Sequence, residues 1–238
     1  MCYVICGLKR VVIILKRNAI EDLIKWKSSE ERKPMVLKGA RQVGKTWLMK
    51  EFGKNYYSSY VYFNFDEEDE LKSIFEVNKN PYRIIELLSM IAGEKIIPGE
   101  TLIIFDEVQE CPEALNSLKY FKEKANDYHV IAAGSLLGTL LAKPKSYPVG
   151  MVNLLDIFPL TFDEFLEAID EPLYAYYCSI EKEQHIEEIF HNRLLEAYNY
   201  YLIIGGMPEC VTSWVKYKDP ARIARIQREL IEVYENDF

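Results

Sequence analysis

The sequence predicts a three-layer α/β/α fold, in which a five-stranded parallel sheet lies between helices, followed by a small helical region. Short apolar runs without polar alternation indicate strands that are covered on both faces, as in parallel sheets. These runs alternate with segments of helical periodicity, which is typical of parallel strands joined by right-handed crossovers. After Pro159 only helical periodicity remains. We therefore expect an α/β core over residues 1–156 and a helical region over residues 157–238.

The five strands are predicted from their composition and from the residues that end them. The run over residues 101–105 is apolar throughout and fits a central strand, whereas the run over residues 60–65 is rich in aromatic and branched side chains. Gly134 ends another buried run. The expected strands span residues 35–37, 60–65, 101–105, 129–133 and 151–155.

Helices are predicted where apolar residues recur three and four positions apart. Gly93 closes one of them, and Pro220 begins the last. The expected helices span residues 20–27, 47–52, 84–91 and 115–121 in the core, then 162–166, 186–198 and 220–233. The apolar run over residues 11–15 is too short to cross a bilayer and lacks a small-residue cleavage site. It indicates a leading strand or the start of a helix.

Composition excludes several classes of protein. The chain has 238 residues and a formal net charge of -8, which argues against nonspecific binding of nucleic acid by the whole surface. A local basic patch remains compatible with that charge. The five cysteines are scattered without C-x-x-C spacing, and the three histidines form no metal-ligand pattern. We expect reduced thiols, no membrane segment and a cytoplasmic location.

One short segment carries the most specific chemical signal. Residues 39–46 read G-A-R-Q-V-G-K-T, the G-x-x-x-x-G-K-T pattern of a P-loop, between a predicted strand and a predicted helix. Glycines let the backbone aim N–H groups at phosphate oxygens, and the helix start favours an anion. Lys45 can reach the β- and γ-phosphates, and the Thr46 hydroxyl can bind Mg²⁺. The pattern predicts a nucleoside triphosphate with Mg²⁺ as the ligand.

Two acidic residues form the expected second half of that site. Asp106 and Glu107 follow the apolar strand over residues 101–105, at the end where parallel sheets bind ligands. Asp106 can orient Mg²⁺, and Glu107 can polarise a water for attack on the γ-phosphate. Ser135 follows the next strand along the chain. It either senses the γ-phosphate or caps a helix, and the sequence leaves both roles open.

These residues, taken with further segments, resemble a prokaryotic branch of the AAA+ ATPases that is close to the signal-transducing STAND group. The G-x-R-Q-V-G-K-T form and the segment F-P-L-T-F-D-E-F are far more specific than a bare P-loop. The resemblance covers nearly all of the chain from Leu15 on. Its matching segments are residues 37–46, 105–109, 133–137, 158–165, 205–209 and 234–238.

The resemblance implies a P-loop NTPase sheet of the ASCE type, with the Asp106 strand between the P-loop strand and the Ser135 strand. It implies ATP or ADP and Mg²⁺ as cofactors. It also implies three catalytic residues: Glu107 as the base, Lys45 as a phosphate ligand and Ser135 as a sensor-like residue. It makes the helical region a lid, in which Pro208 approaches the adenine; a simple helix-ending turn is the other interpretation of that segment. The predicted nucleotide-contacting residues are Gly39, Ala40, Arg41, Gln42, Val43, Gly44, Lys45, Thr46, Trp47 and Pro208, and the predicted Mg²⁺ ligands are Thr46 and Asp106.

Two departures from the family pattern leave alternatives open. Met151 stands where relatives usually carry a basic residue, and the chain stops at Phe238, where relatives usually continue. Our first hypothesis is an ATPase whose hydrolysis drives a conformational switch, with slow turnover if that basic residue matters. The alternatives are a STAND-like nucleotide-gated module with little turnover, or a P-loop phosphotransferase. The resemblance is compatible with an oligomer, and with an unknown protein or nucleic-acid partner bound through a further C-terminal domain.

Arg222, Arg225 and Arg228 form a stripe on the last predicted helix. Such a stripe can contact a nucleotide or nucleic acid, although a solvated helix face is the more common explanation.

Overall fold

The structure is a computed structural model that describes residues 3–6, 9–12, 15–135 and 150–235. The chain divides into two compact units. One is Ala19–Ile157, and the other combines Met1–Asn18 with Phe158–Phe238. The first eighteen residues thus group with the C-terminal helices, whereas the sequence analysis placed them in the α/β core. We call the two units the sheet unit and the helical unit.

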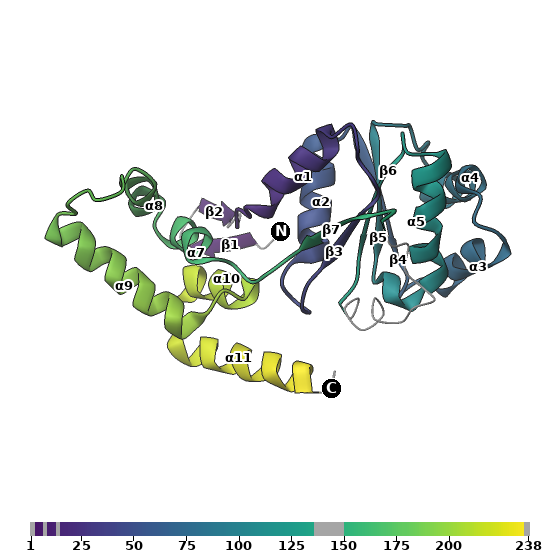
Figure 1. The fold of residues 1–238 in the computed structure, drawn as a ribbon. Helices are drawn as coiled ribbons and strands as arrows, with labels where there is room; N and C mark the ends of the chain where they lie inside the picture. The colour runs from purple at the N-terminus through teal and green to yellow at the C-terminus, as the bar shows by residue number, and fades with distance from the viewer. Residues whose placement is uncertain (1–2, 7–8, 13–14, 136–149, 236–238) are drawn as a thin grey trace. The chain divides into compact units, whose positions relative to one another are not determined.

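The sheet unit is built on a five-stranded sheet in which all recorded pairings are parallel (Figure 1). This confirms the predicted fold class. Two neighbouring strands of the sheet, β5 and β6, are buried along their whole length, as the apolar runs predicted. The strands are β3 (Met35–Lys38), β4 (Ser59–Asn64), β5 (Thr101–Asp106), β6 (His129–Ala133) and β7 (Asn153–Asp156).

The strand order corrects one prediction. The order is β4-β5-β6-β3-β7, so the strand before Ser135 lies between the P-loop strand and the Asp106 strand. Ile131 of β6 pairs with Met35 on one side and with Ile104 on the other. The prediction that the Asp106 strand takes this middle place is wrong. Parallel strands are joined by long crossovers, so the chain can pass from β3 to the sheet edge at β4. The next two strands, β5 and β6, then occupy the places between β4 and β3.

Helices cover both faces of this sheet (Figure 1). The helices α1 (Ala19–Ser28) and α2 (Lys45–Tyr56) lie on one face, and α3 (Asp69–Val77), α4 (Pro81–Ala92) and α5 (Pro112–Lys124) lie on the other. A short 3-10 turn, η1 (Val108–Glu110), follows β5.

Aromatic rings fill the core between the sheet and the helices α3 to α5. The Phe105 ring of β5 lies within 6.5 Å, centroid to centroid, of Phe63, Phe65, Phe75 and Phe121. These contacts bury the strand that ends at Asp106, and so hold the acidic residues at a rigid sheet edge.

The helical unit contains an antiparallel hairpin and five described helices. The hairpin pairs β1 (Tyr3–Cys6) with β2 (Lys9–Val12). The helices are α7 (Phe162–Ile169), α8 (Glu171–Cys178), α9 (Glu188–Ile204), α10 (Pro208–Tyr217) and α11 (Pro220–Glu235). Among the described residues, none of the helices has the length and apolarity that a bilayer crossing requires.

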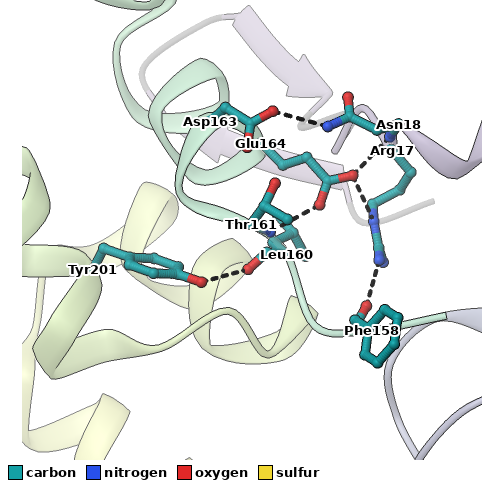
Figure 2. Close-up of polar contacts among 8 residues, drawn as sticks. All are labelled: Arg17, Asn18, Phe158, Leu160, Thr161, Asp163, Glu164 and Tyr201. Atoms are coloured by element: carbon teal, nitrogen blue, oxygen red, sulfur yellow. Dashed lines mark hydrogen bonds and ion pairs between the residues drawn. The ribbon is translucent and has the colours of Figure 1, made fainter.

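A buried polar cluster ties the N-terminal segment to α7 within this unit (Figure 2). Arg17 Nε lies 3.3 Å from Glu164 Oε1, and both side chains are 5% exposed. Asn18 N donates to the same oxygen at 2.7 Å, while Thr161 N donates to Glu164 Oε2 at 3.0 Å. Arg17 Nη2 also donates to Phe158 O at 2.6 Å. These bonds explain why residues before Asn18 group with the helical unit rather than with the sheet.

The same cluster explains part of the segment over residues 158–165. Tyr201 Oη donates to Leu160 O at 2.9 Å (Figure 2). Leu160 N donates to Gly206 O at 2.7 Å. A Cβ atom at Gly206 would lie 2.1 Å from Leu160 O, so only glycine allows this approach. The F-P-L-T-F-D-E-F segment is therefore a structural element of the helical unit, which binds both the N-terminal segment and the turn before α10.

Candidate functional site

The P-loop of the sheet unit has the backbone shape that its glycines predict. Gly39 has a φ of 154°, and a Cβ atom there would lie 2.2 Å from Ile157 O. Gly44, with a φ of 91°, ends the loop as the N-cap of α2. Even the non-glycine Gln42 adopts a positive φ of 62°. The loop therefore curls around a point in front of the first turn of α2, the arrangement that binds phosphate.

Lys45 is held against this loop. Its Nζ donates to Gly39 O at 2.9 Å and to Ala40 O at 2.7 Å, and the residue is 7% exposed. Burial lowers the pKa of the Lys45 ammonium, and the carboxylates of Glu107 and Asp106 oppose that shift. The side chain thus supplies a buried positive charge at the mouth of the loop.

Thr46 and Asp106 come from different elements and meet directly. Thr46 Oγ1 donates to Asp106 Oδ2 at 2.6 Å, and Tyr62 Oη from β4 donates to the same oxygen at 3.0 Å. The Glu107 amide donates to Asp106 Oδ1 at 3.0 Å. Burial, with the nearby Asp106 carboxylate, raises the pKa of Tyr62, so the tyrosine stays a hydrogen-bond donor. Asp106, which is 2% exposed, is therefore fixed as an acceptor of defined direction.

Glu107 follows Asp106 in a strained backbone conformation. Its φ of 48° and ψ of 44° are left-handed, which a residue with a side chain adopts at a free-energy cost of about 1 kcal/mol or more. Glu107 Oε2 accepts from Gln109 Nε2 at 2.6 Å and from Ser135 Oγ at 3.4 Å. The inserted strand β6 thus brings Ser135 beside the catalytic-base candidate.

These side chains line one cavity of about 530 Å³, within the size range of small-molecule sites. Among the predicted site residues, Arg41, Gln42, Gly44, Lys45, Thr46, Trp47, Glu107 and Ser135 line it. Sequence reasoning did not assign roles to three further lining residues, Asp66, Gln109 and Glu110. Gln109 ends one of the segments that carry the resemblance, and Asp66 begins the acidic run over residues 66–70, a pattern typical of a solvated loop or, less often, of a metal site. Glu110 had no signal beyond its charge.

Pro208 belongs to the other compact unit. It is the first residue of α10, after the N-cap Met207, and Gly205 ends α9 with a φ of 73°. Within the helical unit this segment forms a turn between two helices, and an adenine contact by Pro208 stays a prediction. Residues 136–137 of the segment after β6 lie outside the described residues.

The donor atoms of the cavity fit a nucleotide with Mg²⁺. A threonine hydroxyl and an aspartate carboxylate, 2.6 Å apart, are hard oxygen ligands of the kind that Mg²⁺ takes while keeping several waters. The loop backbone and Lys45 suit phosphate oxygens. No group of three or more His, Cys, Asp or Glu side chains in the described part of the chain forms another metal-binding cluster.

The fold and the cavity define a P-loop nucleotide-binding protein. The sequence matches the AAA domain family over residues 31–166, more than half of the chain, and the protein therefore belongs to that family. A search of curated proteins finds no match.

Three solved structures are among those to which the chain is similar. PCH-2 from C. elegans has a TM-score of 0.50 at 12% identity, over 93% of this chain and 70% of that one. AMPPCP-bound DnaA from Aquifex aeolicus has a TM-score of 0.43 at 14% identity, over 91% and 66%. A STAND ATPase with a tetratricopeptide repeat sensor, from Pyrococcus horikoshii, has a TM-score of 0.43 at 17% identity, over 84% and 29%. At such identities the similarity to PCH-2 is one of fold alone.

Proposed function

We propose that this protein binds ATP with Mg²⁺ and hydrolyses it to ADP and phosphate, and that hydrolysis drives a conformational switch. The observation that carries the proposal is that P-loop residues, Lys45 and Glu107 line one cavity, with Asp106 hydrogen-bonded behind the lining residue Thr46. Glu107 lines that cavity from the end of β5, at the same sheet edge as the loop that follows β3. A bound phosphate chain is therefore expected to lie between the P-loop and a carboxylate that can take a proton from water.

In this proposal each residue has a distinct task. The P-loop amides and Lys45 bind and orient the β- and γ-phosphates, and Thr46 and Asp106 hold Mg²⁺, which neutralises charge on the phosphate oxygens. Glu107 takes the proton of a water whose oxygen bonds to the γ-phosphorus while the bond to the ADP oxygen breaks. Ser135, hydrogen-bonded to Glu107, is the candidate for relaying the presence of the γ-phosphate.

A second candidate is a STAND-like nucleotide-gated module that holds ADP with little turnover. Two observations favour it. Lys45 and Glu107 are both engaged by protein groups, and Met151 stands where relatives usually have a basic residue. A phosphotransferase ranks below both, because a glutamate directly after Asp106 is better suited to activating water than to binding a second substrate.

The test is phosphate release by the wild type against two variants. We expect Lys45→Ala to lose nucleotide binding, and Glu107→Gln to bind ATP while turnover falls about 10²–10⁴-fold, the size of a general-base contribution. Lys54→Ala, an exposed change on the same helix α2, is the control and should leave both unchanged. Full turnover in Glu107→Gln would remove Glu107 from the mechanism. Tightly bound ADP without phosphate release in the wild type would select the second candidate.

We further propose a cytoplasmic location, assembly into an oligomer, and a protein or nucleic-acid partner. Cys111, Cys178 and Cys210 are free thiols, which suits a reducing compartment.

A further inference from the structure

Gln109 holds the catalytic-base candidate by a short hydrogen bond. It lies in the 3-10 turn η1, two residues after Glu107, and its Nε2 donates to Glu107 Oε2 at 2.6 Å. Ser135 Oγ approaches the same oxygen at 3.4 Å. Both of the hydrogen bonds that the described residues make to this carboxylate therefore end on Oε2. Oε1 is the oxygen left to take a proton from water.

The other end of the Gln109 amide is unsatisfied. Gln109 Oε1 is buried and has no hydrogen-bond partner among the described residues. Reversing the amide would not help, since it would set Oε1 against a carboxylate oxygen that can only accept. An unpaired buried acceptor costs free energy, and so does the left-handed backbone of Glu107.

These two unfavourable features are adjacent and serve one contact. A side chain that served stability alone would be expected to pair both ends of its amide, as most buried polar groups do. Gln109 instead lines the nucleotide cavity, and among the described residues its side chain is hydrogen-bonded to Glu107 alone. The contact thus fixes the direction of a carboxylate rather than contributing to folding.

We propose that Gln109 is a positioning residue for the hydrolysis proposed above: it fixes the Glu107 carboxylate with Oε2 occupied and Oε1 directed to the attacking water. The proposal rests on the proposed function of Glu107. It assigns no contact between Gln109 and the nucleotide, so nucleotide affinity should not depend on its amide.

The experiment compares Gln109→Met, a change of similar length and volume without the amide, with the wild type, Glu107→Gln and the double variant. Gln184→Met, in an exposed loop of the helical unit, is the matched control. Four quantities are measured: kcat and KM for ATP, the Kd for ADP, and the thermal unfolding midpoint of the nucleotide-free protein.

We expect Gln109→Met to lower kcat about ten- to a hundredfold, the size seen when an outer-shell partner of a reactive group is removed, with KM and the Kd for ADP unchanged. The unfolding midpoint should stay the same or rise, because an unpaired buried amide is replaced by an apolar chain. In the Glu107→Gln background the same change should have no further effect on kcat, since the carboxylate to be positioned is gone.

Three results would overturn the inference: unchanged kcat in Gln109→Met, a lowered unfolding midpoint together with weaker ADP binding, or a full additional loss in the double variant. Failure of the proposed function looks different. In that case the wild type binds nucleotide without releasing phosphate, and the stability comparison of Gln109→Met still shows whether the amide is retained at a cost to folding.

Discussion

Two glutamates, the buried Glu164 of the helical unit and the half-buried Glu107 of the sheet unit, have opposite kinds of environment. Glu164 in the helical unit has both carboxylate oxygens occupied: Oε1 by Arg17 and Asn18, Oε2 by Thr161. Glu107 in the sheet unit is bonded at Oε2, has a left-handed backbone, and is held by an amide whose own oxygen is unpaired.

The difference separates a polar cluster that stabilises a fold from one that is organised around a ligand. Removing the partner of a fully paired buried charge costs much free energy, but such a carboxylate has no free oxygen to accept a hydrogen bond from a substrate. Strain and unpaired atoms beside a cavity are retained where geometry matters more than stability.

Removing the partner of Glu164 should strongly destabilise the helical unit. We expect Arg17→Met to lower the free energy of unfolding by about 3–5 kcal/mol, because it leaves a buried carboxylate charge without its counter-ion. Urea denaturation measures the change. Arg193→Met is the control: its partner Asp170 and Arg193 itself are 27% and 49% exposed, and such pairs contribute about 0–1 kcal/mol. A loss below about 1 kcal/mol in Arg17→Met would contradict a structural role for the cluster.

A single methyl group tests close backbone contacts in the two units. Gly39→Ala and Gly206→Ala each place Cβ within 2.2 Å of a backbone oxygen, so each should cost about 3 kcal/mol, the upper part of the overpacking range. Only Gly39→Ala is expected to weaken ADP binding, which calorimetric titration measures. Gly93→Ala is the control, since its Cβ meets nothing within 4 Å and only its φ of 68° is unfavourable. Weaker ADP binding in Gly206→Ala would instead support a nucleotide contact by the neighbouring Pro208.

A third polar site, at the opposite end of β6, should make stability depend on pH. Tyr57 Oη lies 2.7 Å from His129 Nδ1. Burial lowers the pKa of His129 to about 4, and the positive charges of Arg32 and Lys27 add to that shift. Because the unfolded chain binds the proton more readily, stability is complete above about pH 6.5 and is lost as pH falls toward 4.

Between pH 7.5 and 5.0 the expected loss is about 2 kcal/mol. Urea denaturation at the two pH values measures it. Replacing His129 by Phe should remove most of that difference, whereas the same change at the exposed His185 should leave it in place. An equal pH dependence in His129→Phe and the wild type would show that other groups cause it.

The smallest effects should be the same in both units. Asn80 Oδ1 accepts from Tyr82 N at 3.1 Å before α4, and Asp219 Oδ1 accepts from Ala221 N at 2.9 Å before α11. Each precedes a proline at the first helical position. We expect Asn80→Ala and Asp219→Ala each to cost about 1 kcal/mol, and the double variant to lose their sum, in urea denaturation. A cap worth much more in one unit would mean that the two units differ in more than their glutamates.

The sequence by itself determined the elements and the reacting groups. The strands over β3 to β7, the helix α2 after the P-loop, and the residues Lys45, Thr46, Asp106 and Glu107 were all readable, since apolar periodicity and the G-x-x-x-x-G-K-T spacing are local patterns. Gly93, predicted to close a helix, does so with a φ of 68°. Each of these features depends on residues within one or two turns of each other.

Only the tertiary structure decided which distant residues meet. It placed β6 rather than β5 beside the P-loop strand, grouped the N-terminal segment with α7 through Arg17 and Glu164, and left Gln109 Oε1 unpaired. Arg17 and Glu164 are 147 positions apart, and nothing periodic links them. Strand order depends on how the crossover connections pack against the sheet. Long-range polar pairing depends on which buried polar groups can form hydrogen bonds in the same packed structure. Those are properties of the packed chain, and no local pattern carries them.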